Sequence, residues 1–148
     1  MNFGIIGTGE ITAKFIANAS LNPEFKAAAI LSRSRERGQA FAECGIPAVY
    51  TTLDEMAADT SVDAVYIASP NSAHCEQSIR MLEAGKHVFC EKAVASDSRE
   101  LNAMLKAAEK NGKVFLEAMR PAFNPDLARL KAIIADLGQP RNALISVC

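Results

Sequence analysis

The fold is decided by the stretch Phe3-Gly4-Ile5-Ile6-Gly7-Thr8-Gly9-Glu10-Ile11-Thr12-Ala13 near the N-terminus. Residues 3–6 form an apolar run that predicts a buried strand, and the apolar spacing over residues 10–19 predicts a helix. A G-x-G turn joins them: the first glycine permits a tight turn, and the second lets a pyrophosphate approach the backbone at the helix N-terminus. Thr12 occupies the third glycine position of the usual pattern, which makes the motif less specific. The stretch predicts a dinucleotide-binding turn, with a tight turn that binds no ligand as the alternative.

The rest of the chain repeats this alternation of strand and helix. Short apolar runs predict further strands, and the amphipathic stretches between them predict helices. Strands are expected at residues 26–31, 48–50, 62–68, 87–90 and 114–116, and helices at residues 35–44, 53–58, 73–84 and about 97–111. Gly45 is expected to cap the second helix, and Asp97 with Glu100 to form a capping box. The pattern favours an α/β fold with a doubly wound parallel sheet, the Rossmann architecture.

The residues beyond the sixth strand depart from this pattern. A helix is predicted over residues 125–137, where apolar residues recur at helical spacing before a glycine and a proline. Residues 142–148 then predict a strand that has no partner in the sequence and would be an exposed edge. We therefore expect a dinucleotide-binding domain at residues 1–120. Residues 121–148 are expected to be the crossover helix and first strand of a second, α+β domain.

The composition argues against several classes of function. The chain has 16 Lys and Arg against 17 Asp and Glu, a net charge of −1, and this balance argues against a nucleic-acid partner. No apolar run is long enough to span a membrane and the first residues lack the features of a signal peptide, so a cytoplasmic location is expected. The 4 cysteines and 2 histidines show no metal-ligand spacing, so no metal site is expected.

The residues after the second predicted strand indicate which cofactor the chain prefers. NAD enzymes usually place an acidic residue there to bind the ribose 2′-OH. This chain instead has Ser32 and Arg33, with Arg35 and Arg37 close behind. An arginine pairs bidentately with a 2′-phosphate and stacks on adenine. NADP is therefore the predicted cofactor and NAD the second choice, while the alternative for these residues is a solvated basic turn.

Polar residues also follow the fourth predicted strand. Ligands of doubly wound sheets bind at the carboxyl ends of the strands. Ser69, Pro70 and Asn71 are therefore expected to line the cofactor site. His74 is expected either to contact this site or to face solvent at the start of a helix.

The fifth predicted strand ends at Cys90-Glu91-Lys92. A lysine at this strand end would lie near the nicotinamide, where Lys92 can donate a hydrogen bond to a substrate oxygen and assist proton transfer. The alternative is an ordinary solvated turn. Cys90 is expected to be a packing residue, because no histidine partner for a nucleophile is evident.

Together these motifs resemble the Gfo/Idh/MocA family of oxidoreductases, and in particular its dihydrodiol dehydrogenase-like branch. The matching segments are Gly-Thr-Gly-Glu-Ile at 7–11, Ser-Arg at 32–33, Asp-Ala-Val-Tyr-Ile-Ala-Ser-Pro-Asn at 63–71, His74, Ala-Gly-Lys-His-Val-Phe-Cys-Glu-Lys at 84–92 and Glu-Ala-Met-Arg-Pro-Ala-Phe-Asn-Pro at 117–125. The resemblance implies a Rossmann domain followed by an open, mostly antiparallel sheet through which members often form homo-oligomers. It also implies that Lys92 contacts the substrate and handles a proton, although Ala93 replaces the proline of the family motif.

The resemblance further implies an NADP(H)-dependent oxidoreductase of a small sugar, polyol, diol or carbonyl substrate. Its remaining catalytic residues would lie beyond Cys148, so residues 1–148 alone are expected to lack dehydrogenase activity. The alternative, favoured by Ala93, is a dinucleotide-binding sensor or interaction module without catalysis. Lys92 is the expected catalytic residue. The expected cofactor-binding residues are Gly7, Thr8, Gly9, Glu10, Ile11, Ser32, Arg33, Arg37, Ser69, Pro70, Asn71, His74, Glu91, Lys92 and Arg120.

Overall fold

The computed structural model describes residues 1–43, 45–136, 139 and 141–142. They divide into two compact units, Met1–Ala118 and Met119–Cys148. The strands are β1 (Asn2–Ile6), β2 (Lys26–Leu31), β3 (Ala48–Tyr50), β4 (Ala64–Ile67), β5 (His87–Cys90) and β6 (Phe115–Glu117). The α-helices are α1 (Glu10–Ala19), α2 (Arg35–Ala42), α3 (Leu53–Ala58), α4 (His74–Glu83), α5 (Ser98–Asn111) and α6 (Asp126–Asp136), and the 3-10 turns are η1 (Asn71–Ala73) and η2 (Arg120–Phe123).

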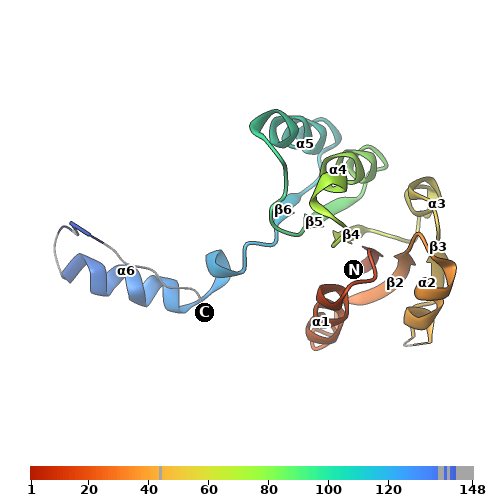
Figure 1. Ribbon diagram of the computed structural model, residues 1–148, viewed down its shortest axis with the longest axis horizontal. Helices are drawn as coiled ribbons and strands as arrows, with labels where there is room; N and C mark the ends of the chain where they lie inside the picture. Colours follow the sequence, from red (N-terminus) through yellow and green to blue (C-terminus); the bar gives the residue numbers. More distant parts are fainter. Residues whose placement is uncertain (44, 137–138, 140, 143–148) are drawn as a thin grey trace. The chain divides into compact units, whose positions relative to one another are not determined.

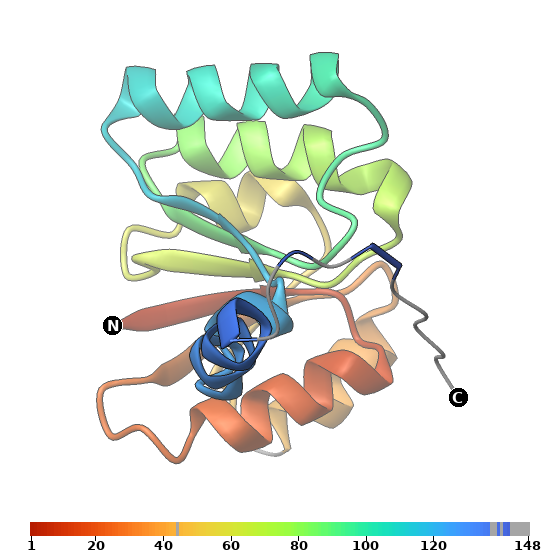
Figure 2. The same cartoon turned by 90° about the vertical axis from the view of Figure 1, so that its left-hand side faces the viewer.

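The first unit is a parallel six-stranded sheet in the order β3-β2-β1-β4-β5-β6 (Figure 1). Helices α1 and α2 cover one face, and α3, α4 and α5 cover the other (Figure 2). The strand order reverses direction between β1 and β4. Crossovers on the two sides of this point lead to opposite faces, which leaves a crevice at the carboxyl ends of the strands. The fold confirms the predicted doubly wound parallel sheet.

The core lies on both faces of the sheet, because neighbouring strand residues point in opposite directions. Ile6 packs with Met81, Leu82 and Met104 on the side of α4 and α5. The next residue back, Ile5, packs on the side of α1 and α2. This burial of both faces explains why the strands read as continuous apolar runs rather than as alternating ones.

An aromatic cluster fills the space beneath α1. The ring of Phe15 on α1 stacks on that of Tyr66 in β4, with 3.7 Å between ring centroids. Phe3, Phe25 and Phe89 surround this pair. Tyr66 is 1% exposed, so its ring is fixed between the sheet and the helix.

Several predicted elements have the predicted limits, and the differences arise mainly at their ends. α1, α3, β2, β3 and β5 agree residue for residue with the sequence pattern. Strand β4 is shorter than predicted, because Val62 belongs to the preceding turn and donates its N–H to the Asp59 carbonyl at 3.4 Å. The helix predicted over residues 73–84 consists of the η1 turn followed by α4. β6 lies one residue later than predicted.

Two predicted helix caps are wrong in detail. α2 ends at Ala42 with Glu43 as its C-cap, while Gly45 lies two residues beyond and donates its N–H to the Ala42 carbonyl at 2.8 Å. Asp97 caps α5, but the Glu100 carboxylate accepts from the N–H of Ser96 and not from that of Asp97, so the box is incomplete.

A complete capping box instead starts α3. The hydroxyl of Thr52 accepts from the N–H of Glu55, and the Glu55 carboxylate accepts from the N–H of Thr52. The S/T-x-x-E pattern that signals such a box was visible in the sequence.

The second unit contains η2 and α6. α6 agrees with the predicted helix over most of its length. Leu137, Gly138 and Pro140, where the predicted helix ends, and residues 143–148 of the predicted strand lie outside the described residues. The assignment of this unit to a second domain stays a prediction.

Candidate functional site

The turn between β1 and α1 needs glycine at two positions for different reasons. Gly7 has φ +112°, and a Cβ there would lie 2.6 Å from the carbonyl oxygen of Ala68. A Cβ at Gly9 would meet no atom within 4 Å, and no side chain caps α1, whose N-cap is Gly9. Gly7 therefore allows β1 and β4 to lie close together, whereas Gly9 borders open space at a helix N-terminus. An anion can reach the backbone amides there, so this cradle fits a pyrophosphate.

Thr12 is fully buried and donates its hydroxyl to the carbonyl of Gly7 at 3.2 Å. This bond ties the first turn of α1 to the glycine turn. The residue that replaces the third glycine of the motif thus reinforces the turn. The sequence motif, which has glycine at this position, does not indicate this role.

The segment after β2 is arranged by two serines. The hydroxyl of Ser32, a buried residue, accepts from the N–H of Ser34 at 3.3 Å. The hydroxyl of Ser34 accepts from the N–H of Arg37 at 3.3 Å and caps α2. A Cβ at Gly38 would lie 2.5 Å from Val49 Cγ1, so α2 packs closely on β3. These contacts hold the start of α2 at the carboxyl end of β2.

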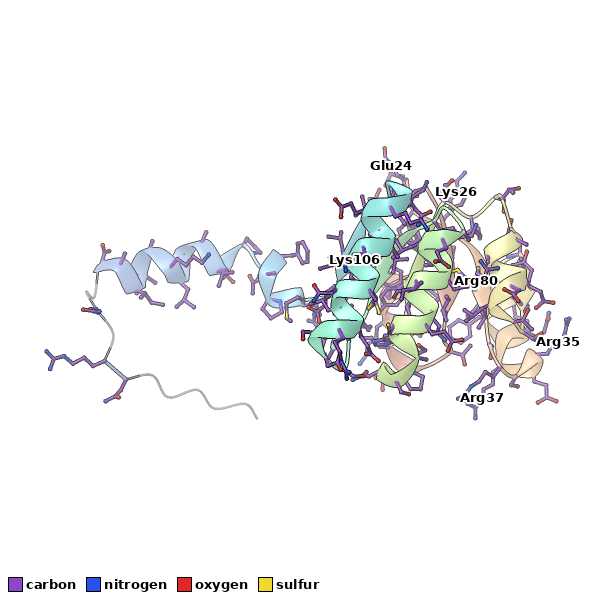
Figure 3. All side chains as sticks on the ribbon, turned by 90° about the horizontal axis from the view of Figure 1, so that it is seen from above. Glu24, Lys26, Arg35, Arg37, Arg80 and Lys106 are labelled. Atoms are coloured by element: carbon purple, nitrogen blue, oxygen red, sulfur yellow. The ribbon has the colours of Figure 1, made fainter. Side chains whose placement is uncertain are left out.

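The arginines of this segment differ in where they lie. Arg33 and Arg37 line an open cleft, and neither forms an ion pair with a carboxylate of the described residues. Arg35 does not line that cleft. Arg35 and Arg37 leave α2 in different directions (Figure 3). Two guanidinium groups are therefore available to an anionic ligand at the end of β2.

The cleft has a volume of about 780 Å³ and lies at the carboxyl ends of β1, β2 and β4. Its lining residues are Ile6, Gly7, Thr8, Gly9, Leu31, Ser32, Arg33, Ser34, Arg37, Ala68, Ser69, Pro70, Ser72, Ala73 and Gln77. The structure thus brings together eight of the expected residues: Gly7, Thr8, Gly9, Ser32, Arg33, Arg37, Ser69 and Pro70.

Sequence reasoning missed the part of the cleft that α4 contributes. Gln77 lies one helical turn after Ala73, and its Oε1 accepts the hydroxyl proton of Ser69 at 2.6 Å. None of the hydrogen bonds of the described residues involves its amide nitrogen, which can donate to a ligand. Ala73 is the N-cap of α4, and the i, i+4 spacing places Gln77 on the same face of that helix. That spacing would have indicated Gln77 once Ser69 was placed in the site.

The other expected residues are not among those that line this cleft. Glu10 forms an ion pair with Lys14, at 2.6 Å between Oε1 and Nζ, on the exposed side of α1. Ile11 is also exposed, and Asn71 begins η1. Arg120 belongs to the second unit. Their cofactor contacts stay predictions.

His74 is fully buried, so the alternative that it faces solvent is wrong. Its Nδ1 lies 2.9 Å from the carbonyl oxygen of Ala93, and its Nε2 lies 2.9 Å from that of Ser69. His74 therefore connects the segment after β4 with the segment after β5. A direct contact with a cofactor stays a prediction.

Glu91 and Lys92 follow β5 directly. The Tyr66 hydroxyl donates to Glu91 Oε1 at 2.7 Å, and the N–H of Lys92 donates to Glu91 Oε2 at 3.3 Å. Burial and the adjacent Glu91 carboxylate raise the pKa of Tyr66, so its hydroxyl keeps the proton that it donates. The Lys92 side chain is exposed, and the Lys92–Ala93 peptide bond is cis.

Cys90 is fully buried at the end of β5, and burial raises the pKa of its thiol to about 12. A thiol that stays protonated is a poor nucleophile. Its environment fits the predicted packing role.

Among the described residues, no group of histidines, cysteines and carboxylates could hold a metal ion. Within the same part of the chain, no helix is long and apolar enough to cross a membrane.

Residues 1–119 match the family model GFO_IDH_MocA, described as an oxidoreductase family with an NAD-binding Rossmann fold. The chain is 42% identical to a scyllo-inositol 2-dehydrogenase (NADP(+)) of Bacillus subtilis, over 100% of this chain and 45% of the relative. It is 30% identical to a trans-1,2-dihydrobenzene-1,2-diol dehydrogenase of Bos taurus, over 91% of this chain and 41% of the relative. The chain therefore spans less than half the length of these relatives.

Solved structures share the fold. One is a 3-ketoreductase from Actinomadura kijaniata in complex with NADP and TDP-benzene, with a TM-score of 0.85 and 28% identity. The match covers 93% of this chain and 42% of that one.

Proposed function

The chain belongs to the Gfo/Idh/MocA oxidoreductase family, and on this premise we propose that its first unit binds NADP(H) for hydride transfer. The proposed substrate is a sugar, polyol, diol or related carbonyl compound. The scyllo-inositol and dihydrodiol dehydrogenases among the relatives support this substrate class. The observation that carries the cofactor proposal is that Arg33 and Arg37 line the cleft after β2 and form no ion pair with any carboxylate in the part of the chain that the structure describes.

In this proposal, some residues of the chain bind the cofactor and Lys92 takes part in the reaction. The amides at the start of α1, beside Gly9, bind the pyrophosphate with the positive end of the helix dipole. Arg33 and Arg37 bind the 2′-phosphate by charge-assisted hydrogen bonds, and Ser32 keeps the segment in place. The bound nicotinamide would supply or accept the hydride. Lys92 donates a hydrogen bond to the reacting oxygen of the substrate and holds or returns its proton.

The experiment that tests this proposal compares Arg33→Ala with Arg35→Ala in fluorescence titrations with NADPH and NADH. Losing a charge-assisted hydrogen bond costs about 1.5–3 kcal/mol, so Arg33→Ala should weaken NADPH binding roughly ten- to hundredfold. NADH lacks the 2′-phosphate and should bind almost unchanged. Arg35→Ala removes an equal charge outside the cleft and should affect neither cofactor strongly. Equal losses for NADPH and NADH in Arg33→Ala would contradict the proposal.

The activity of the whole protein requires a substrate site in addition to this cleft. We propose that further catalytic residues, and a sheet through which copies associate, belong to a second domain like that expected for the family. Residues 1–148 alone should then bind NADPH without measurable turnover, because orientation of the substrate supplies a large share of any rate enhancement. Cofactor binding without turnover in the natural protein that contains these residues would favour a non-catalytic binding module.

A further inference from the structure

In each of the three residues after Glu91, one backbone group contacts a side chain. The N–H of Lys92 donates to Glu91, the carbonyl of Ala93 lies against His74, and the N–H of Val94 donates to Glu117. We call Lys92, Ala93 and Val94 the lysine turn. The Lys92 side chain is exposed, and its Nζ forms no hydrogen bond or ion pair with a described residue. What fixes this residue is therefore its backbone.

The first support of the lysine turn begins in the core. Tyr66 is 1% exposed and stacked against Phe15, so its hydroxyl cannot move far. That hydroxyl donates to one oxygen of Glu91, and the other oxygen accepts from Lys92 N–H. Tyr66 thereby fixes the carboxylate that receives the Lys92 amide.

The second support is His74. Its ring is fully buried between two carbonyl oxygens, each 2.9 Å from a ring nitrogen. One carbonyl belongs to Ala93 in the lysine turn and the other to Ser69 in the cofactor cleft. The ring therefore sets the distance between the proposed cofactor site and the lysine turn.

The third support comes from β6. Cys90 and Glu117 are register partners in the pairing of β5 with β6, and the N–H of Ala118 donates to the Cys90 carbonyl at 2.8 Å. Glu117 Oε1 accepts from the N–H of Val94 at 3.1 Å. The pairing of β5 with β6 thus places the Glu117 carboxylate next to the N–H of Val94.

We propose that Tyr66, His74 and Glu117 are positioning residues that direct the Lys92 side chain toward the reacting oxygen. This inference rests on the proposed role of Lys92. Its physical basis is that alanine at position 93 leaves φ free, whereas a proline would fix it. Contacts of side chains from β4, α4 and β6, the first acting through Glu91, supply the constraint that the residue type does not. The three residues act through the backbone of the lysine turn and do not touch the substrate.

The first experiment measures amide hydrogen exchange at Val94 in two variants of Glu117. Glu117→Gln keeps an oxygen acceptor and removes the charge, whereas Glu117→Met removes the acceptor at similar length. Exchange at Val94 should rise about tenfold in Glu117→Met and change less than twofold in Glu117→Gln. Unchanged exchange in Glu117→Met would overturn the proposal without reference to activity.

The second experiment is a double-mutant cycle with Lys92→Met in the natural protein that contains residues 1–148. Glu117→Met should lower kcat about tenfold while the Kd for NADPH changes less than twofold, and Glu117→Gln should restore most of the kcat. In the Lys92→Met background the same substitution should change kcat less than twofold, because its effect passes through Lys92. An equal loss of kcat in both backgrounds would overturn the proposal.

Two further variants test the other two supports, and they keep the proposal testable if Glu117→Met does not fold. Tyr66→Phe removes the hydroxyl that donates to Glu91, and His74→Gln removes the ring that lies between the Ala93 and Ser69 carbonyls. Each should lower kcat several-fold only when Lys92 is present. If Lys92→Met alone keeps full turnover, the proposed role of Lys92 fails and the positioning role fails with it. Hydrogen exchange at Val94 still reports whether the backbone support exists, so the two failures are distinguishable.

Discussion

The proposed cofactor cleft and the lysine turn lie at the same edge of the sheet but are built in different ways. The cleft is built mainly by near neighbours in the chain: Thr12 bonds to Gly7, and Ser34 bonds to Ser32 and Arg37. The supports of the lysine turn come from 25, 19 and 23 residues away in the sequence. A site of the first kind is marked by short motifs, although the cleft also needs β1, β2 and β4 paired in the sheet. A site of the second kind exists only when β4, β5 and β6 are correctly paired.

The largest expected effect would separate the two regions by function. Lys92→Met, in the natural protein that contains residues 1–148, should lower turnover roughly 10²–10⁴-fold, the usual contribution of a positioned acid–base group. NADPH affinity should change less than about twofold, because the cleft is formed by other residues. Steady-state kinetics and NADPH titration check the prediction. Full turnover in this variant would leave the lysine turn without a chemical role.

The next effect tests the cleft itself by comparing its two glycines. A side chain at Gly9 would meet no atom of the protein, so Gly9→Val should change the melting temperature little. The same side chain would occupy the space where the pyrophosphate approaches the backbone, so NADPH affinity should fall roughly a hundredfold or more. Gly7→Ala forces a Cβ against Ala68 at a positive φ and should cost about 2–4 kcal/mol of stability. Titration and denaturant unfolding separate the two. A folded Gly9→Val variant with normal affinity would refute the cleft as the pyrophosphate site.

A smaller effect is expected at Thr12, where the cleft depends on one buried hydrogen bond. Thr12→Val keeps the shape of the side chain but removes the hydroxyl that donates to the Gly7 carbonyl. Unfolding in urea should show a loss of about 1 kcal/mol, and NADPH affinity should fall a few-fold. No change in either quantity would mean that the turn is held by its backbone alone.

The smallest effect concerns carboxylates outside both regions. Hydrogen bonds from the backbone N–H groups of Thr51 and Thr52 lower the pKa of Glu55. Hydrogen bonds from the N–H of Glu100 and from the Arg99 side chain lower the pKa of Asp97. A lowered pKa in the folded state gives stability that is present at neutral pH and is lost as pH falls through that pKa. Melting temperature should therefore drop in acid, and Glu55→Gln with Asp97→Asn should flatten that drop. An identical pH profile in the double variant would contradict this assignment.

The difference between the two regions also explains what the sequence could predict. That the glycine turn, Ser32 and Arg33 line one cleft can be predicted, because their signals lie within a few residues of strand ends. Gln77 becomes predictable only once Ser69 is placed in the site, because their contact depends on how α4 follows β4. The bond from Thr12 to Gly7 is local, but the motif has glycine at that position and assigns threonine no role there. Tyr66 and Glu117 were missed because nothing local marks a core tyrosine or a strand-end glutamate as a support. His74 was noticed from its position, but its two carbonyl contacts follow only from the folded arrangement of β4 and β5.

The stacked pair of Phe15 and Tyr66 has a consequence for protein engineering. Phe15 belongs to α1, the helix whose N-terminus borders the cofactor cleft, and Tyr66 leads through Glu91 to Lys92. A redesign of α1 aimed only at exchanging one cofactor for another would, if it altered residue 15, also disturb the lysine turn. Libraries that retune cofactor choice should therefore vary the residues after β2 and keep the ring at position 15.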